Sequence, residues 1–99
     1  MARLKIKISD GALAWFKDEM DVSAGDHIRF RVRYGGAGLQ PGFSIGLSPD
    51  DPDSPAASEE RDGVTFFVEK DDEWYFDGHD LIVDYDENLD EPDYRYEKA

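Results

Sequence analysis

Two acidic residues and a histidine in the second half of the chain have the chemistry to bind a metal or to move a proton. Asp77 and His79 flank Gly78, and Asp84 follows on a predicted strand. Carboxylate oxygens and imidazole nitrogens bind divalent cations such as iron(II), and an Asp/His pair can act as a general base. A plain turn at "FDGHD" explains the same residues, so metal binding, a small Asp/His enzyme and a structural turn are open alternatives.

The segment "YGGAGLQPG", residues 34–42, is the second candidate site. Its residues Gly35, Gly36, Ala37 and Gly38 form a candidate ligand-binding loop, because glycine lets a backbone approach a ligand closely. A dinucleotide fingerprint needs a third glycine and a following helix, and a phosphate-binding P-loop ends in Gly-Lys-Ser/Thr. The third glycine, the following helix and the Gly-Lys-Ser/Thr ending are all missing here. The segment therefore predicts a glycine-dependent hairpin connection, with phosphate binding disfavoured.

Three arginines make the third candidate, an interaction surface. Arg29, Arg31 and Arg33 alternate with apolar residues in "HIRFRVRY", so they share one face of a predicted strand. Such a stripe suits an anion or an acidic peptide. The alternative is that acidic neighbours such as Glu69 or Asp84 pair with it across the sheet.

The elements that position these residues begin with a strand and a helix. The alternation in "LKIKI", residues 4–8, predicts a half-buried strand whose Lys5 and Lys7 would extend the arginine stripe if the two strands paired. Ser9 is a good helix N-cap. Apolar residues at helical spacing then predict one amphipathic helix over residues 10–20.

The rest of the chain is predicted to be β structure joined by turns. Strands are expected at residues 27–34, 42–48, 64–69, 81–85 and 93–98, with a loop at 49–60 and a short turn or single helical turn ending at Gly78. The fold class is mainly β with one N-terminal amphipathic α-helix. The 99 residues are expected to form a single domain, 1–99.

Composition limits the function classes. The chain has no cysteine, so it offers no thiolate for catalysis, zinc or an iron–sulfur cluster. Its net charge is −13, and the acidic excess lies in residues 41–99, which disfavours binding of nucleic acid or anionic membranes. The N-terminus does not read as a signal peptide and no stretch is apolar enough to span a membrane, so we expect a cytoplasmic protein.

The order of these segments resembles the HesB-like family, the A-type carriers of iron–sulfur cluster assembly. The residues that carry the resemblance lie within 4–85: "ISDGALAWFKDEM", "IRFRVRYGGAG" and "VTFFVEKDDEWYFDGHDLIVDY". It implies a HesB-like β-sandwich of mixed sheets, and a monomer or homodimer. The family's first cluster-binding cysteine falls at or beside Ala37, and its C-terminal Cys-Gly-Cys segment has no counterpart in "DEPDYRYEKA".

The resemblance therefore implies the fold without the cluster chemistry. We expect a non-enzymatic binding or regulatory module with no cofactor, linked to iron–sulfur assembly through a protein partner. A divalent metal (iron) protein that uses carboxylates, and a small enzyme with an Asp/His pair, are the alternatives.

Overall fold

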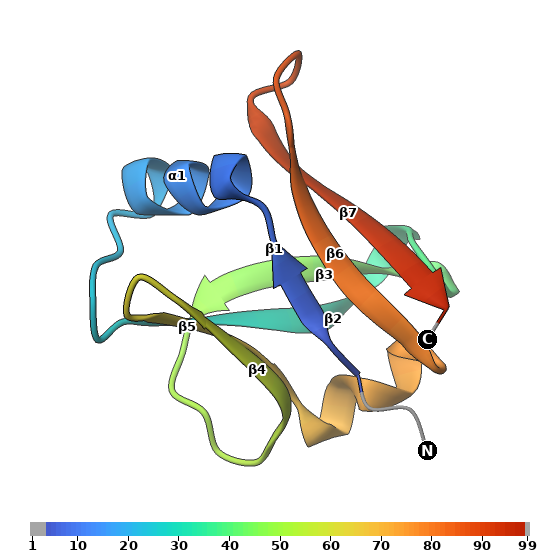
Figure 1. Cartoon of the computed structure of the whole chain (residues 1–99). Helices are drawn as coiled ribbons and strands as arrows, with labels where there is room; N and C mark the ends of the chain where they lie inside the picture. The colour runs from blue at the N-terminus through green and yellow to red at the C-terminus, as the bar shows by residue number, and fades with distance from the viewer. Residues whose placement is uncertain (1–3, 99) are drawn as a thin grey trace.

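The computed structural model describes residues 4–98, which form seven strands, one α-helix and one 3₁₀ helix (Figure 1). The first part of the chain contains β1 (Ile6–Ile8), α1 (Asp10–Glu19), β2 (His27–Ala37) and β3 (Pro41–Pro49). The second part contains β4 (Pro55–Arg61), β5 (Val64–Glu69), η1 (Lys70–Phe76), β6 (His79–Asp86) and β7 (Glu91–Lys98). The predicted mainly β class is confirmed.

The strands form two mixed sheets. The smaller sheet has the order β1-β6-β7, with β1 parallel to β6 and β7 antiparallel to β6. The larger sheet has the order β3-β2-β5-β4, with β2 parallel to β5 between two antiparallel pairs. Figure 1 shows the smaller sheet lying across one face of the larger one, with strands running in different directions.

The core fills the space between the two sheets and α1. Alternation along β2 turns Ile28 and Phe30 inward, and both are fully buried. Phe66 of β5 and Phe16 of α1 meet Phe30 there, with ring centroids 5.1 to 6.2 Å apart. These rings bring α1, β2 and β5 together in one apolar cluster.

The helix α1 begins where the sequence predicts. The Ser9 side chain accepts a hydrogen bond from the backbone N–H of Ala12 at 3.1 Å, which satisfies one of the free N–H groups at a helix start. Ala12, Leu13 and Phe16 are the buried residues of the helix. None of the helices described within residues 4–98 is long and apolar enough to cross a membrane.

The glycine segment differs from a connection over residues 35–41, the gap between the two predicted strands. Strand β2 continues through Gly35 and Gly36 to Ala37, which pairs with Pro41, and a register shift lies between Tyr34 and Ala37. Only residues 38–40 connect the two strands. Gly35 and Gly36 have positive φ values of +107° and +77°, which let the strand kink and continue. The glycine content therefore indicates a bulged hairpin rather than an open loop.

The loop predicted at residues 49–60 was wrong for its second half. Pro55–Arg61 forms β4, an edge strand that pairs antiparallel with β5. The sequence "PAASEER" carries no apolar alternation, because an edge strand with one exposed side buries little. The pair Asp62-Gly63 closes the hairpin with φ values of +52° and +81°, the signature of a tight two-residue turn.

Gly63 gives a test of this packing. A Cβ at Gly63 would lie 2.9 Å from Cα and 2.7 Å from Cβ of Ala24, while a Cβ at Gly25 would meet nothing within 4 Å. Both residues have positive φ, which costs an alanine about 1–2 kcal/mol. We expect Gly63→Ala to lower the free energy of unfolding by about 2–4 kcal/mol because backbone must move as well. Urea unfolding measures it. The matched control Gly25→Ala should cost about 1–2 kcal/mol, and equal losses would contradict the packing argument.

Candidate functional site

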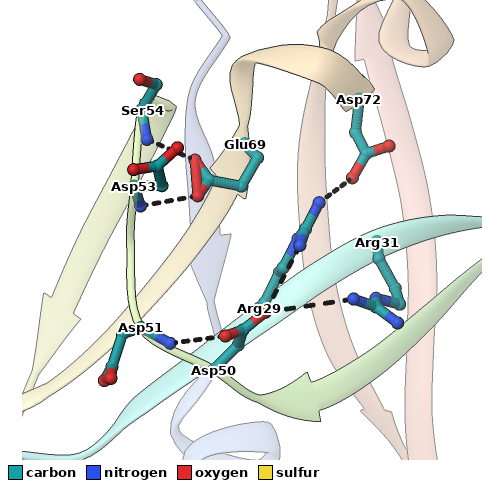
Figure 2. Close-up of polar contacts among 8 residues, drawn as sticks. All are labelled: Arg29, Arg31, Asp50, Asp51, Asp53, Ser54, Glu69 and Asp72. Atoms are coloured by element: carbon teal, nitrogen blue, oxygen red, sulfur yellow. Dashed lines mark hydrogen bonds and ion pairs between the residues drawn. The ribbon is translucent and has the colours of Figure 1, made fainter.

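Arg29 is the centre of a polar cluster on the outer face of the larger sheet (Figure 2). Its Nη1 lies 3.3 Å from an Asp50 carboxylate oxygen and its Nη2 lies 3.2 Å from Asp72. The Arg29 and Asp72 side chains are only 20% and 14% exposed. Partial burial weakens the competition from water, so these hydrogen-bonded ion pairs hold β2, the segment after β3 and η1 together.

Glu69 holds the acidic segment that follows β3. Its carboxylate accepts hydrogen bonds from the backbone N–H groups of Asp53 at 2.7 Å and Ser54 at 2.9 Å, and the residue is 7% exposed. The N–H of Lys70 donates to the Ser54 carbonyl at 2.9 Å. The segment 50–54 is therefore anchored beside the arginine cluster, as Figure 2 shows, and borders a surface pocket of about 290 Å³.

The two Nη atoms of Arg29 are paired within this cluster, while its buried Nε has no hydrogen-bond partner among the described residues. Burial pulls the pKa of Arg29 down, but the hydrogen bonds to Asp72 and Asp50, together with the charges of Asp72 and Glu69, outweigh burial and raise it. The pKa of Asp50 is lowered, first by the hydrogen bond from the Asp51 N–H and then by the one from Arg29. Arg29 is therefore committed to internal partners, Asp50 and Asp72, and these differ from the predicted partners Glu69 and Asp84.

Arg31 and Arg33 are less involved in internal ion pairs than Arg29, so their charges are more available to a partner. The nearest carboxylate oxygen to Arg31 belongs to Asp50, at 3.9 Å, and among residues 4–98 no ion pair involves Arg33. The predicted extension of the stripe by Lys5 and Lys7 does not occur, because β1 lies in the other sheet. The candidate interaction surface thus narrows to two exposed arginines.

The glycine of the β2–β3 connection accommodates a tyrosine. Tyr75 is fully buried, and its hydroxyl accepts a hydrogen bond from the backbone N–H of Leu39 at 2.7 Å. A Cβ at Gly38 would overlap the Tyr75 hydroxyl and lie 2.8 Å from the Phe43 carbonyl oxygen. The space that the missing side chain leaves at Gly38 is filled by the protein itself.

The candidate metal residues have separate surroundings. His79 donates from Nδ1 to the carbonyl oxygens of Phe76 and Asp77, at 2.9 and 3.1 Å. Asp84 accepts from Arg95 at 2.6 Å, and the side chain of Asp77 is exposed. Within the described part of the chain, no three His, Cys, Asp or Glu residues are grouped as a metal site would require.

An exposed aromatic row includes Tyr34 and Phe43, which the sequence reasoning did not single out as surface residues. Tyr34 is 90% exposed and Trp74 is 53% exposed, and Phe43 contacts both rings edge-on, with centroids 5.7 and 5.3 Å away. The row continues inward from Trp74 to Tyr75. Tyr34 is the last residue of the alternating pattern in β2, directly before the glycines. That end position was the signal in the sequence that its side chain could lie beyond the core.

Comparison with known proteins gives the relationship of this chain. No protein-family model matches it. It is 47% identical over 95 residues to the Bacillus subtilis (strain 168) protein named pyruvate dehydrogenase inhibitor, covering 95% of this chain and all of that protein. It is 36% identical over 95 residues to an uncharacterized Staphylococcus saprophyticus protein, covering 92% and 97% of the two chains.

These similarities place the chain in a class of small proteins of similar length. The chain belongs to the family of the Bacillus subtilis pyruvate dehydrogenase inhibitor.

The resemblance to HesB-like iron–sulfur carriers was wrong, together with the expected link to iron–sulfur assembly, because the full-length relative is an inhibitor and no family model supports the carriers. The motif residues have local roles here that explain their order. Gly78 has a φ of +78° at the turn into β6, Leu81 is buried in the core and Asp84 pairs with Arg95. The metal-binding and Asp/His enzyme alternatives also gain no support from the relatives.

The cluster predicts how stability depends on pH. The pKa of Asp50 is lower in the folded protein than its ordinary value of 3.8, so its carboxylate stabilises the fold above that pH. This contribution is lost as the pH falls through the folded-state pKa. We expect Asp50→Asn to be less stable than the wild type at pH 6 and to lose less stability below pH 4, by urea unfolding.

The matched control is Asp53→Asn, because the Asp53 contact to Glu69 uses only its backbone N–H. This variant should follow the wild-type pH profile. An Asp50→Asn profile that parallels the wild type at every pH would contradict the role of Asp50.

Proposed function

We propose that this protein inhibits a pyruvate dehydrogenase by binding to it, without catalysing a reaction itself. The observation that carries the proposal is the 47% identity to a protein named pyruvate dehydrogenase inhibitor over the whole length of that protein. Because the match covers the whole relative, the inhibition that the relative's name states must be carried by the region that matches this chain. A small domain can act in this way with surface contacts alone and needs no cofactor.

The surface has residues that suit a protein interface. Interface centres are enriched in aromatic residues and arginine. Tyr34 and Trp74 are large exposed aromatics, and Arg31 and Arg33 lie on the same hairpin as Tyr34. These residues support binding of a protein partner near the β2–β3 hairpin, where Tyr34 and the two arginines lie on opposite faces of the sheet.

The acidic charge supports association with a basic surface. A net charge of −13 on 99 residues produces a strong negative potential. Opposite potentials accelerate encounter, and salt screens them with a Debye length of about 8 Å at 0.15 M. Inhibition that depends on this attraction should weaken as the salt concentration rises.

The test is an activity assay with the pyruvate dehydrogenase complex purified from the same organism. Pyruvate-dependent NADH formation should fall in a saturable way as the purified protein is added, and the concentration for half-inhibition should rise between 50 and 300 mM NaCl. Calorimetry on the same components measures binding independently of activity.

The control is an unrelated acidic protein of similar size and charge, which should not inhibit. Full activity and no binding heat at a large excess of this protein would refute the proposed function.

A further inference from the structure

Strand β3 is an edge strand of the larger sheet, with β2 on its only paired side (Figure 1). Its sequence, "PGFSIGLSP", has no charged residue, which is true of no other strand within residues 4–98. Edge strands are normally protected from further pairing by charges, bulges or short length. The opposite edge strand, β4, carries Glu59, Glu60 and Arg61. Between its terminal residues Pro41 and Pro49, β3 carries no such charge on its open edge.

The hydrogen-bond pattern shows which groups of β3 face the open side. The N–H of Thr65 in β5 donates to the Asp26 carbonyl at 3.0 Å, while the N–H of Asp50 donates to the His27 carbonyl at 3.4 Å. Bonding directions alternate along a strand, so odd-numbered residues of β2 bond β3. Their partners are Ser44, Gly46 and Ser48.

The backbone groups of the intervening residues of β3 therefore point away from β2. Phe43, Ile45 and Leu47 are these residues. The N–H of Phe43 donates to the Gln40 carbonyl at 3.2 Å, which closes one end of the row. Within the described residues, the N–H and C=O groups of Ile45 and Leu47 bond to no other element. They form a template for one more strand.

The two exposed arginines, Arg31 and Arg33, reach over this edge strand. A Cβ at Gly46 would lie 2.7 Å from Cδ of Arg33 and 3.8 Å from Cγ of Arg31, so both side chains lie across Gly46. The neighbouring residues Ser44 and Ser48 are also small. The positive charge of β2 is thus presented beside the open edge, in a protein whose net charge is −13.

We infer that β3 binds an extended segment of the partner that alternates acidic and apolar residues, and that this segment adds to the sheet as a fifth strand. Its backbone would pair with Ile45 and Leu47, its acidic side chains with Arg31 and Arg33, and its apolar side chains with the opposite face of β3. Strand addition combines backbone affinity with side-chain specificity in this way. The inference rests on the proposed function, which makes the partner a pyruvate dehydrogenase.

A second copy of this chain suits the edge less well. Its own β3 would bring only Ser44, Gly46 and Ser48 to the arginines. It would also bring a second net charge of −13, which opposes association. Charge complementarity therefore favours an acidic strand from a different protein.

The first arm of the test compares two substitutions of one residue. Leu47→Pro and Leu47→Ala both remove the leucine side chain, but only proline removes the N–H that points to the open edge. We expect the concentration for half-inhibition of the pyruvate dehydrogenase complex to be about 10-fold higher for Leu47→Pro than for Leu47→Ala. Equal values for the two folded variants would overturn the inference, and circular dichroism checks folding.

The second arm reverses one charge. Arg33→Glu should raise the concentration for half-inhibition about 10-fold or more, because it places an acid against the acidic side of the incoming strand. Lys98→Glu is the matched control: it makes the same change in net charge at an exposed position in the other sheet. Equal effects of the two reversals would mean that only net charge matters, which also overturns the inference.

Hydrogen exchange on the complex locates the contact without any substitution, so it decides the question even if Leu47→Pro does not fold. The amides of Ile45 and Leu47 should exchange more slowly when the complex is present. Inhibition with protection only elsewhere would overturn this inference and leave the proposed function intact. If the wild type neither binds nor inhibits, both fail. A dimer in sedimentation that Leu47→Pro dissociates would assign the edge to a second copy instead.

Discussion

Burial of three phenylalanine rings between the two sheets is the constraint on which the rest of the structure depends. Phe16 comes from α1, Phe30 from β2 and Phe66 from β5, and all three are fully buried. Each ring removes a large apolar area from water, worth about 1.5–3 kcal/mol. Tyr94 of β7 adds an edge-on contact to Phe30 at 6.1 Å. Elements from both ends of the chain can meet only if β2 and β5 pair side by side in the middle of the larger sheet.

That central pairing determines where charge can go. Because the inner face of β2 is committed to the core, its three arginines all lie on the outer face. Arg29 is drawn into internal pairs with Asp50 and Asp72, where partial burial strengthens the contacts. Arg31 and Arg33, further along the strand, extend beyond that cluster. A strongly acidic protein thereby keeps a small basic area next to an uncharged edge strand.

The predictions that succeeded were those decided by local pattern. The alternation around Phe30 and the Ser9 cap each depend on neighbours within a few residues. The predictions that failed concerned features that depend on which segments, distant in sequence, lie next to each other in the fold. Strand β4 is polar and exists because β5 lies beside it. The HesB-like resemblance read a turn at Gly78 and a pair at Asp84 as family motifs, although many strand-turn-strand folds need such residues.

The sequence by itself determined a mainly β domain with an early helix, no cysteine chemistry and a stripe of arginines on one face of a strand. Hydrophobic periodicity and residue type carry that information directly. Only the tertiary structure decided which arginines are neutralised, that Gly38 makes room for Tyr75, and that β3 is left at an edge. Those facts depend on which strands, distant in sequence, pair with one another, and pairing between strands is not encoded in the pattern of either strand alone.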